Sequence, residues 1–273
     1  MRPRAWQRIA LLFVAAVFAT PLLFMLVVSL QPEGKGFERS ALDLLHERHF
    51  ENYAQALVRM GGFGRFLWNT ILITVLSIAG QLLTCSLAGY AFARVPFRGR
   101  DTLFLLVLAT MLLPDQVTAI PRFLLFRQLG LVDTYYPLVL PTVLGGAPFF
   151  IFLFRQYFLA LPAELSDAAR VDGCGHPQIW WRIMLPLARP MLVTVGIFTF
   201  LATWNDFWAP LIYLVSPENK TLTLALASFT RTYDTAVEHL MAASAVVLLP
   251  CVFVYFLAQR LFLRGVAVAA SKG

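Results

Sequence analysis

The sequence predicts an all-α integral membrane protein with six transmembrane helices. Of the 273 residues, 59% are apolar and only 14% are charged, and the mean hydropathy is +0.71. A soluble domain carries about 25% charged residues, because polar side chains must cover the surface that folding leaves exposed. Six separate stretches are apolar over about 20 residues, which is the length of a helix that crosses a bilayer. A water-soluble monomer and a disordered chain are therefore excluded.

The six predicted spans lie at residues 9–30, 68–93, 103–121, 134–154, 190–217 and 240–259. Four of them contain no charged residue, whereas the third contains Asp115 and the fifth contains Asp206. The first span has the position of a cleaved signal peptide. Its apolar stretch exceeds the about 7–15 residues of a signal core, however, and no small-residue cleavage site follows it. We interpret it as a retained helix, so that residues 1–273 form a single transmembrane domain.

The charges between the spans predict the orientation of the chain. Two sets of connecting segments alternate, the first being 1–8, 94–102, 155–189 and 260–273 and the second being 31–67, 122–133 and 218–239. The first set holds 13 Lys and Arg against 4 acidic residues, and the second holds nine of each. Cytoplasmic loops carry an excess of Lys and Arg, so both termini are expected in the cytoplasm. The net charge of +7 then reflects topology, and no nucleic-acid partner is expected.

Polar or small residues follow one helical face in two of the spans. These residues are Thr70, Thr74, Ser77, Gln81, Thr84 and Ala88 in the second span, and Gly196, Thr199, Thr203 and Asp206 in the fifth. Because polar groups are costly in lipid, both faces should look into the protein or into water. A seam for close helix packing and the lining of a pathway are both open interpretations. The candidate pathway residues are Gln81, Asp115, Thr199, Thr203, Asn205 and Asp206.

Signs of enzyme chemistry are missing from the sequence. There is no phosphate-binding GxxxxGK[ST] loop, no span contains a histidine, and the two acidic residues within spans lie on different helices. His46 and His49 lie near Glu47 and Glu51, where a metal site is conceivable, but a solvated helix face is the favoured interpretation. The three cysteines share no short spacing that would indicate a disulfide or metal framework. No cofactor, metal or catalytic group is therefore expected in this chain.

The segment 161–190 contains the most specific pattern in the chain. Its sequence predicts a short helix over 163–171, with acidic residues near its start and Gly173 as a left-handed cap after its end. A second helix is predicted over 178–184, with apolar residues on one side. A pair of amphipathic helices in a cytoplasmic loop either lies on the membrane surface or docks a partner.

A run of small and acidic residues in this segment carries a family pattern. Its members are Asp167, Ala168, Ala169, Asp172, Gly173, Leu185 and Pro186. In this order they resemble the EAA loop of ABC-importer permeases, roughly E-A-A-x-x-x-G followed later by L-P. Asp167 stands where the pattern has Glu, and Cys174 stands where Ala is usual. The resemblance implies that these residues couple the chain to a cytoplasmic ATPase.

The resemblance extends over nearly the whole chain. Further matching positions are Asn52-Tyr53, Trp68-Asn69, 88–94, Pro114, Trp204-Asn205-Asp206, Pro210-Leu211 and 259–273. They resemble the second, MalG-like permease of carbohydrate importers, a binding-protein-dependent transport inner-membrane component. This resemblance implies the fold of a type I ABC importer permease.

The resemblance also implies a function. The chain would be a permease subunit of an ATP-driven importer that moves a sugar or a related polyol or glycoside by alternating access. The implied partners are a second permease subunit, two ATPase subunits that bind ATP and Mg, an external solute-binding protein and the lipid bilayer. The implied location is the plasma (inner) membrane of a bacterium or an archaeon. The alternative is an ion-coupled secondary transporter that uses Asp115 or Asp206 as an ion site, which leaves the 161–190 segment unexplained.

Overall fold

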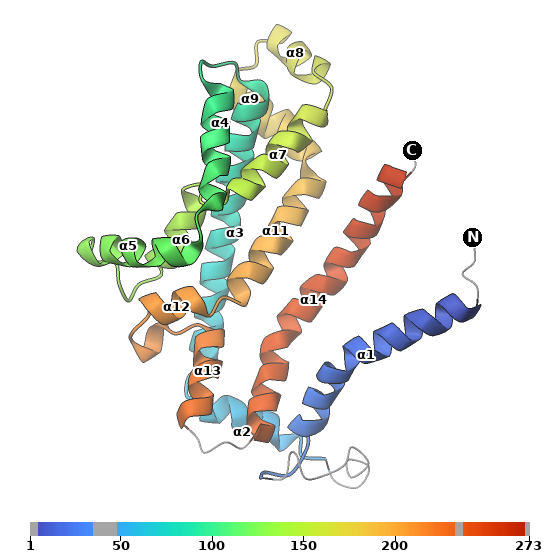
Figure 1. The fold of residues 1–273 in the computed structure, drawn as a ribbon, viewed down its shortest axis with the longest axis vertical. Coiled ribbons are helices and arrows are strands. Elements are labelled where there is room, and N and C mark those ends of the chain that lie inside the picture. The colour runs from blue at the N-terminus through green and yellow to red at the C-terminus, as the bar shows by residue number, and fades with distance from the viewer. Residues whose placement is uncertain (1–4, 35–47, 233–236, 271–273) are drawn as a thin grey trace. The chain divides into compact units, whose positions relative to one another are not determined.

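The structure is a computed structural model that describes residues 5–34, 48–232 and 237–270. The regular elements in these residues are helices, and no strand occurs among them (Figure 1). The all-α class predicted from the composition is therefore confirmed. The chain divides into two compact units. One contains Met1–Phe66 and Leu222–Pro250, and the other contains Leu67–Thr221 and Cys251–Gly273.

Helices that are long and apolar enough to cross a membrane overlap the predicted spans. Four satisfy this test alone, namely Trp6–Ser29, Phe63–Arg94, Tyr136–Ala160 and Val237–Gln259. Two further pairs satisfy it together but are bent, Arg100–Leu112 with Asp115–Gln128 by 99° and His176–Leu187 with Arg189–Trp204 by 80°. When each bent pair is counted as one crossing, the described residues provide six spans.

The first unit is built from α1 (Ala5–Ser29), α2 (Glu51–Arg59), α13 (Leu222–Thr232) and the start of α14 (Val237–Ala270). The buried side chain of Asn52 joins α2 to the end of α1. Its Nδ2 donates to the carbonyl of Ser29 at 2.9 Å and to that of Gln31 at 2.7 Å. Carbonyls at a helix end have no partner within the helix. The side chain of Asn52 supplies a hydrogen-bond donor to the last carbonyl of α1.

Arg59, the last residue of α2, links three elements of the same unit. Its guanidinium contacts the two carboxylate oxygens of Glu33 at 2.8 and 3.1 Å and Nδ1 of His239 at 3.2 Å. His239 Nε2 lies 2.9 Å from Oε1 of Gln55, so the imidazole accepts from Arg59 and donates to Gln55. The hydrogen bond from Arg59 lowers the pKa of the Glu33 carboxyl, which keeps the pair charged.

The second unit is assembled around α3 (Phe63–Arg94), whose first turn belongs to the first unit. Its next helices are α4 (Arg100–Ala109), α5 (Asp115–Gln128), α6 (Tyr136–Val143) and α7 (Pro148–Ala160). They are followed by α8 (Glu164–Val171), α9 (His176–Ile179), α10 (Leu185–Leu187), α11 (Arg189–Trp204) and α12 (Trp208–Tyr213). The part of α14 from Cys251 onward also belongs to this unit. Figure 1 shows α3, α4, α7 and α11 side by side. Tyr90, Phe154 and Phe158 are almost fully buried in this unit, and the ring of Phe158 meets Tyr90 edge-on with centroids 6.0 Å apart. Large aromatic side chains thus form its core.

Two glycines let other helices approach α3 closely. A Cβ at Gly80 would lie 2.4 Å from Cγ2 of Val143 in α6, and one at Gly89 would lie 2.5 Å from Cβ of Phe154 in α7. Both distances fall well inside the contact separation of carbon atoms. The two glycines are nine positions apart, which is about two and a half helical turns, so they face opposite sides of α3. The chain from α6 to α7 therefore contacts both flanks of α3.

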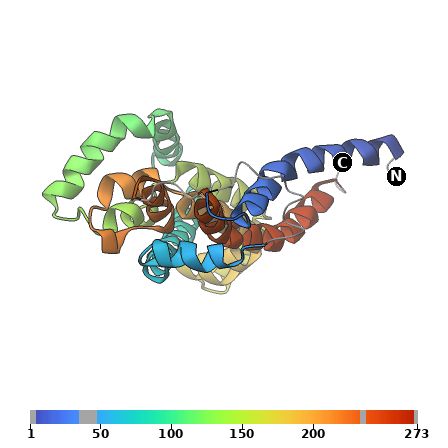
Figure 2. The ribbon, with the colours of Figure 1, turned by 90° about the horizontal axis from the view of Figure 1, so that it is seen from below.

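Proline breaks the third predicted span, 103–121. After α4 the chain passes through the 3₁₀ turn Thr110–Leu112, Leu113 is extended, and α5 starts at Asp115. A residue before proline is pushed out of the helical region, and Pro114 itself lacks a hydrogen-bond donor. The helix axis turns by 99°, and α5 (green) leads away from α4 in Figure 2. The predicted span 103–121 therefore consists of two helices that meet at Pro114.

The fourth and fifth spans are also interrupted. Between α6 and α7, Gly145 has a φ of +82°, a conformation that glycine adopts without strain. The helix α11 stops at Trp204, and the chain turns through Asn205 and Asp206 into α12. The 3₁₀ turn Pro217–Asn219 follows α12. The predicted span 190–217 therefore contains two helices and an irregular end.

Candidate functional site

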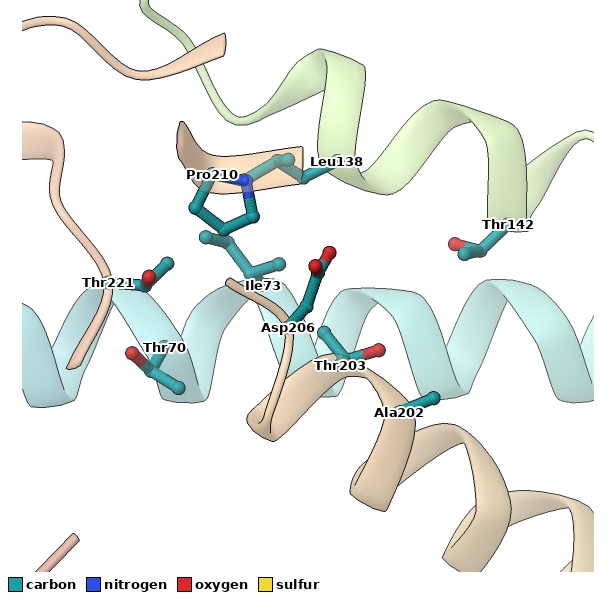
Figure 3. Close-up of a pocket in the computed structure, with 9 residues that line it drawn as sticks. All are labelled: Thr70, Ile73, Leu138, Thr142, Ala202, Thr203, Asp206, Pro210 and Thr221. Atoms are coloured by element: carbon teal, nitrogen blue, oxygen red, sulfur yellow. The ribbon is translucent and has the colours of Figure 1, made fainter. Parts of the chain in front are cut away.

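A cavity of about 210 Å³ lies within the second unit, among α3, α6 and α11 (Figure 3). Its polar lining consists of Thr70, Thr142, Thr203, Asp206 and Thr221, and its apolar lining consists of Ile73, Leu138, Ala202 and Pro210. Thr70 and Ile73 come from α3, and Thr142 comes from α6. Asp206 is the charged side chain among the described residues that line the cavity.

Asp206 reaches the cavity from the turn that follows α11. Its Oδ1 accepts hydrogen bonds from the backbone N–H groups of Trp208 at 3.0 Å and Ala209 at 3.2 Å. These groups start α12, where backbone donors have no partner within the helix. Figure 3 shows the carboxylate between α3 and α6. The side chain therefore caps α12 and faces the cavity at the same time.

The other predicted pathway residues of the fifth span behave differently from one another. Thr203 lines the same cavity as Asp206. Asn205 does not: its Nδ2 donates to the carbonyl of Leu201 at 2.8 Å and lies 3.8 Å from Sγ of Cys251. Thr199, one turn before Thr203, is 3% exposed, and its hydroxyl has no hydrogen-bond partner among the described residues.

The polar face of α3 changes its role along the helix. Thr70 lines the cavity, whereas Oγ1 of Thr84 lies 3.4 Å from the carbonyl of Thr142 and so packs against α6. Between them, Thr74 and Ser77 are buried, and neither hydroxyl has a partner in the part of the chain that the structure describes. The polar face of α3 is a cavity wall near Thr70 and a packing seam near Thr84. The pathway interpretation and the seam interpretation therefore each describe one part of it.

Two further predicted pathway residues, on other helices, also lie outside the cavity lining. Gln81 is 3% exposed on the polar face of α3. Asp115 is the first residue of α5, its side chain is 93% exposed, and its carboxylate lies 3.7 Å from Arg122. The 99° turn before α5 carries Asp115 out of the axis of α4, so it and Asp206 do not form one site.

The segment 161–190 folds into short helices beside the end of α3. The first is α8 (Glu164–Val171), which begins one residue later than predicted and ends where predicted. Gly173 has a φ of +80°, as its predicted role of left-handed cap requires. The second helix begins at His176 instead of residue 178 and includes a π-helical stretch over Trp180–Met184.

The residues of the EAA-like pattern divide between an exposed and a buried set. Asp167, Ala168, Asp172, Gly173 and Pro186 are exposed, Leu185 is half-buried, and Ala169 is buried. Asp167 contacts Arg170 at 3.4 Å on the same helix. A Cβ added at Gly173 would meet no atom within 4 Å. The segment therefore presents small and acidic side chains outward, while Ala169 holds it to the core below.

Polar contacts fix this segment to the end of α3. The guanidinium of Arg94 donates to the carbonyl of Phe158 at 2.7 Å, near the end of α7. Arg170 of α8 donates to the carbonyl of Arg94 at 3.4 Å. The hydroxyl of Tyr90 lies 3.1 Å from Nδ1 of His176. A displacement of α8 would therefore strain contacts to α3 and α7.

Near the other end of α3, Asp133 connects two loops. Its Oδ1 accepts from the backbone N–H groups of Val215 and Ser216, each at 2.9 Å, and its Oδ2 accepts from the Ser216 hydroxyl. Its own N–H donates to the carbonyl of Tyr213 at 2.8 Å. The hydrogen bonds from Ser216 lower the pKa of the Asp133 carboxyl to about 2. These bonds hold Asp133 at a φ of 62°, which non-glycine residues seldom adopt.

Two asparagines hold the same connection between α12 and α13. Nδ2 of Asn219 donates to the carbonyl of Asp133 at 2.7 Å. Nδ2 of Asn69, in α3, donates to the carbonyls of Glu218 at 2.8 Å and Lys220 at 3.0 Å. The residues that lead from α12 to Thr221 in the cavity wall are therefore held at both ends.

The conceivable metal site near His49 is only partly described. Nδ1 of His49 lies 2.8 Å from Oε1 of Glu51, whereas His46 and Glu47 lie outside the described residues. Within the described ranges, no group of three or more His, Cys, Asp or Glu side chains could hold a metal ion.

Several residues of the site were not predicted as site residues from the sequence. Thr142 and Thr221 line the cavity, but each is a single hydroxyl in a segment without a periodic polar face. Thr70 was part of the polar stripe and was not selected as a pathway residue. Asp133 is a lone acidic residue between two spans, and its partners lie more than 80 positions later in the chain. No local pattern could have identified it.

Comparison with known proteins identifies relatives along the whole chain. The family model described as "Binding-protein-dependent transport system inner membrane component" matches residues 85–268. The arabinooligosaccharides transport system permease protein of Halalkalibacterium halodurans is 36% identical over 264 residues, which cover 96% of this chain and 94% of that protein. The lactose transport system permease protein of Rhizobium radiobacter is 35% identical over 198 residues, 72% of each chain.

A solved structure shares the fold. It belongs to a bacterial ABC transporter involved in the import of the acidic polysaccharide alginate. The two chains superpose with a TM-score of 0.80 at 25% sequence identity, over 93% of this chain and 94% of the other. The arrangement of helices around α3 is therefore that of a chain from an ABC importer.

Proposed function

Because the chain belongs to the family of binding-protein-dependent transport system inner membrane components, we propose that it translocates a sugar or a related glycoside. It is a permease subunit of an ABC importer and crosses the plasma membrane several times. The relatives named above act on arabinooligosaccharides, lactose and alginate. All three are built from hydroxylated rings, which supports a solute of that chemistry for this chain.

The exposed face of α8 is the observation that carries the coupling part of the proposal. Asp167, Ala168 and Gly173 are exposed, and small residues let a partner surface approach closely. The bond from Arg170 to the carbonyl of Arg94 and the contact of Tyr90 with His176 connect the same segment to α3. A partner that docks on α8 and moves it would therefore transmit that movement to the helices around the cavity. We assign the docking role to Asp167, Ala168, Ala169, Asp172, Gly173, Leu185 and Pro186.

The remaining components of the importer follow from this assignment. The sequence contains no nucleotide-binding loop, so ATP and Mg would bind to two separate ATPase subunits that dock on the cytoplasmic side. A second permease subunit would complete the pathway, and an external binding protein would deliver the solute. The charge distribution supports an orientation with α8 and both termini in the cytoplasm.

Transport would proceed by alternating access, in which ATPase closure favours the outward-open state. Thr203 and Asp206 line the cavity and are assigned to the solute pathway, and Thr199 is assigned to its inward continuation. An ion-coupled transporter based on Asp115 is not favoured, since that residue lies on the surface beside Arg122 and the relatives are ABC transporter permeases.

Reconstitution tests this function directly. The chain is co-expressed with its partner permease, ATPase and binding protein, and uptake of radiolabelled lactose and arabinobiose into proteoliposomes is measured with ATP inside. We expect uptake that needs both ATP and the binding protein. The purified chain alone should hydrolyse no ATP. Uptake that persists without ATP and follows an imposed ion gradient would contradict the proposal.

A further inference from the structure

A buried histidine at the start of α14 contacts two residues of α2. His239 is fully buried. Its Nδ1 lies 3.2 Å from a guanidinium nitrogen of Arg59, and its Nε2 lies 2.9 Å from Oε1 of Gln55. All three residues belong to the first unit, and Figure 1 shows the start of α14 beside α2. We call this contact of His239 with Arg59 and Gln55 the α2–α14 joint.

The geometry of the α2–α14 joint fixes the protonation state of the imidazole. An arginine guanidinium can only donate hydrogen bonds, so Nδ1 of His239 must offer a lone pair to Arg59. The ring hydrogen then lies on Nε2, which donates to Oε1 of Gln55. A proton added to Nδ1 would point at the N–H groups of Arg59 and place two positive charges side by side. The joint therefore accepts only the neutral ring.

Charged groups from three elements face the imidazole of His239. They are Arg59 of α2, Glu33 after the end of α1, and the neighbouring Glu238 of α14. The two carboxylates attract a proton to the ring, whereas burial and the guanidinium oppose it. Arg59 already donates to both carboxylate oxygens of Glu33, at 2.8 and 3.1 Å. A charged ring would compete with Arg59 for Glu33, so protonation would rearrange the whole cluster.

Glu33 itself does not respond to mild acid. The hydrogen bond from Arg59 lowers the pKa of its carboxyl, and glutamate ordinarily titrates near pH 4.3, roughly. Glu33 therefore keeps its charge in the range in which histidine changes its own, around the ordinary histidine pKa of about 6.5. This leaves the His239 ring as the group of the Arg59–Glu33–His239 cluster that titrates in mild acid.

The α2–α14 joint connects the last span to the first. The helix α2 is tied to the end of α1 by the bonds of Asn52 to the carbonyls of Ser29 and Gln31 and by the contact of the Tyr53 hydroxyl with that of Ser29 at 2.8 Å. The imidazole of His239 adds the start of α14 to this group. Because α14 continues beyond Pro250 into the second unit, a change at its start reaches a helix that both units share.

The charge distribution assigns the α2–α14 joint to the external side. Both segments that meet there, 31–67 and 218–239, belong to the set without an excess of Lys and Arg. We propose that His239 is a positioning residue that joins α14 to α2 as a neutral imidazole, and that external acid protonates it, opens the joint and slows import. This assignment rests on the proposed transport function.

Uptake at controlled external pH tests the role of His239. Proteoliposomes with the assembled importer and ATP inside take up radiolabelled lactose or arabinobiose from neutral (about pH 7.5) or acidic (about pH 5.5) external buffer. The interior stays at neutral pH, so the ATPase side is unchanged. The response of the binding protein to pH is common to wild type and variants. We expect wild-type uptake to fall about tenfold in acidic buffer, as the loss of one hydrogen bond to a charged group predicts.

Substitutions of two histidines in the same unit separate the sensor from its background. His239→Gln keeps an amide that can accept from Arg59 or donate to Gln55 but takes up no proton, so it should retain most of the uptake at neutral pH and show nearly the same uptake in acid. His239→Arg carries a permanent charge and should transport poorly at both pH values. His49→Gln is the matched control. His49 lies 2.8 Å from the carboxylate of Glu51, so a proton strengthens its contact, and this variant should keep the acid response of wild type.

Hydrogen exchange measures the opening of the joint itself. Peptides that cover α2 are followed by mass spectrometry in the detergent-solubilised complex, and wild type is compared with His239→Gln at the same pH. We expect equal protection at neutral pH and faster exchange of α2 in wild type in acidic buffer, because a local contact has opened. Peptides that cover α8, in the other unit, should exchange equally in both proteins.

The outcomes separate this inference from the function on which it rests. A wild-type complex without uptake that depends on ATP and the binding protein at neutral pH refutes the proposed function itself. If that uptake is present but wild type and His239→Gln respond alike to acid, the role of His239 is refuted and the permease function stands. Loss of the acid response in His49→Gln assigns the response to the wrong histidine and also refutes it. Equal protection of α2 in acidic buffer refutes the opening of the joint.

Discussion

Asp133 and Ser216, 83 positions apart in the chain, are joined by two hydrogen bonds that end on the same carboxylate. The backbone N–H of Ser216 donates to Oδ1 at 2.9 Å and its hydroxyl donates to Oδ2. Together with the bond from Asn219, they connect the loop before α6 to the loop after α12. One side chain thereby positions the connection that leads to Thr221 in the cavity wall.

Asp133→Asn should lower the thermal stability of the chain in a pH-dependent way. The pKa of the Asp133 carboxyl is about 2 in the folded state and about 3.9 in an unfolded chain. Because the folded pKa is the lower one, the ionised side chain stabilises the fold above about pH 4, and this contribution is lost as the pH falls toward 2. The apparent Tm of the detergent-solubilised protein, followed by tryptophan fluorescence, should differ between wild type and variant at pH 7. The difference should shrink below pH 4, and one that stays constant would show that the charge is not involved.

Gly89→Ala should destabilise the second unit. The added methyl would lie 2.5 Å from Cβ of Phe154 and 3.0 Å from the backbone nitrogen of Arg155, which cannot move without shifting α7. Overpacking of this kind costs about 1–3 kcal/mol. Gly64→Ala, in the first turn of the same helix, is the matched control, since its methyl would meet nothing within 4 Å and alanine favours the helix by about 1 kcal/mol. Thermal unfolding of both variants in one detergent measures the contrast. Equal stability would mean that α3 and α7 are not closely packed at Gly89.

Thr199→Val should separate folding from transport. The hydroxyl of Thr199 is buried without a partner among the described residues, and leaving such a group unsatisfied costs about 1–3 kcal/mol. Valine has nearly the same shape, so the variant should be at least as stable as wild type. Uptake should fall, because an apolar group then lines the inward continuation of the cavity. A variant that loses stability would instead reveal a structural hydrogen bond at this position.

Substitution of Gly173 should uncouple the importer. The left-handed backbone at Gly173 is also accessible to asparagine at modest cost, and no atom lies where a side chain would start. Gly173→Asn should therefore reach the membrane normally and keep part of its ATP-dependent uptake. Gly173→Trp should reach the membrane at near-normal levels yet lose uptake, because the bulky ring blocks the docking face. Retained uptake by the tryptophan variant, with the ATPase still co-purifying, would leave Gly173 only the role of a helix cap.

Local features of the sequence predicted much of the architecture. Apolar stretches of about 20 residues predict the membrane spans. The acidic residues near the start of α8 and Gly173 after its end predict the bounds of this helix to within one residue. The proline before Asp115 marks where a helix must break. The direction of the break, 99°, depends on the packing of α5 and has no local signal.

The site was predictable only where its residues repeat with a helical period. Thr203 and Asp206 were found because they share a face with other polar residues. Thr142 and Thr221 join them through contacts between segments far apart in the chain, which a single sequence does not record. Asn205 was also named as a pathway residue, but successive residues of a turn point in different directions, and its amide bonds to α11 instead.

The close contacts at Gly80 and Gly89 also limit how the second unit can deform. Sliding α3 by one residue is a shift of about 1.5 Å, and atoms of Val143 and Phe154 already occupy the space next to both glycines. With α6 on one flank and α7 on the other, neither translation nor rotation of α3 is free of collision. These contacts favour a joint movement of the three helices. Bending is less restricted at the chain breaks, among them those beside Pro114 and Ala188, where the helix axes turn by 99° and 80°.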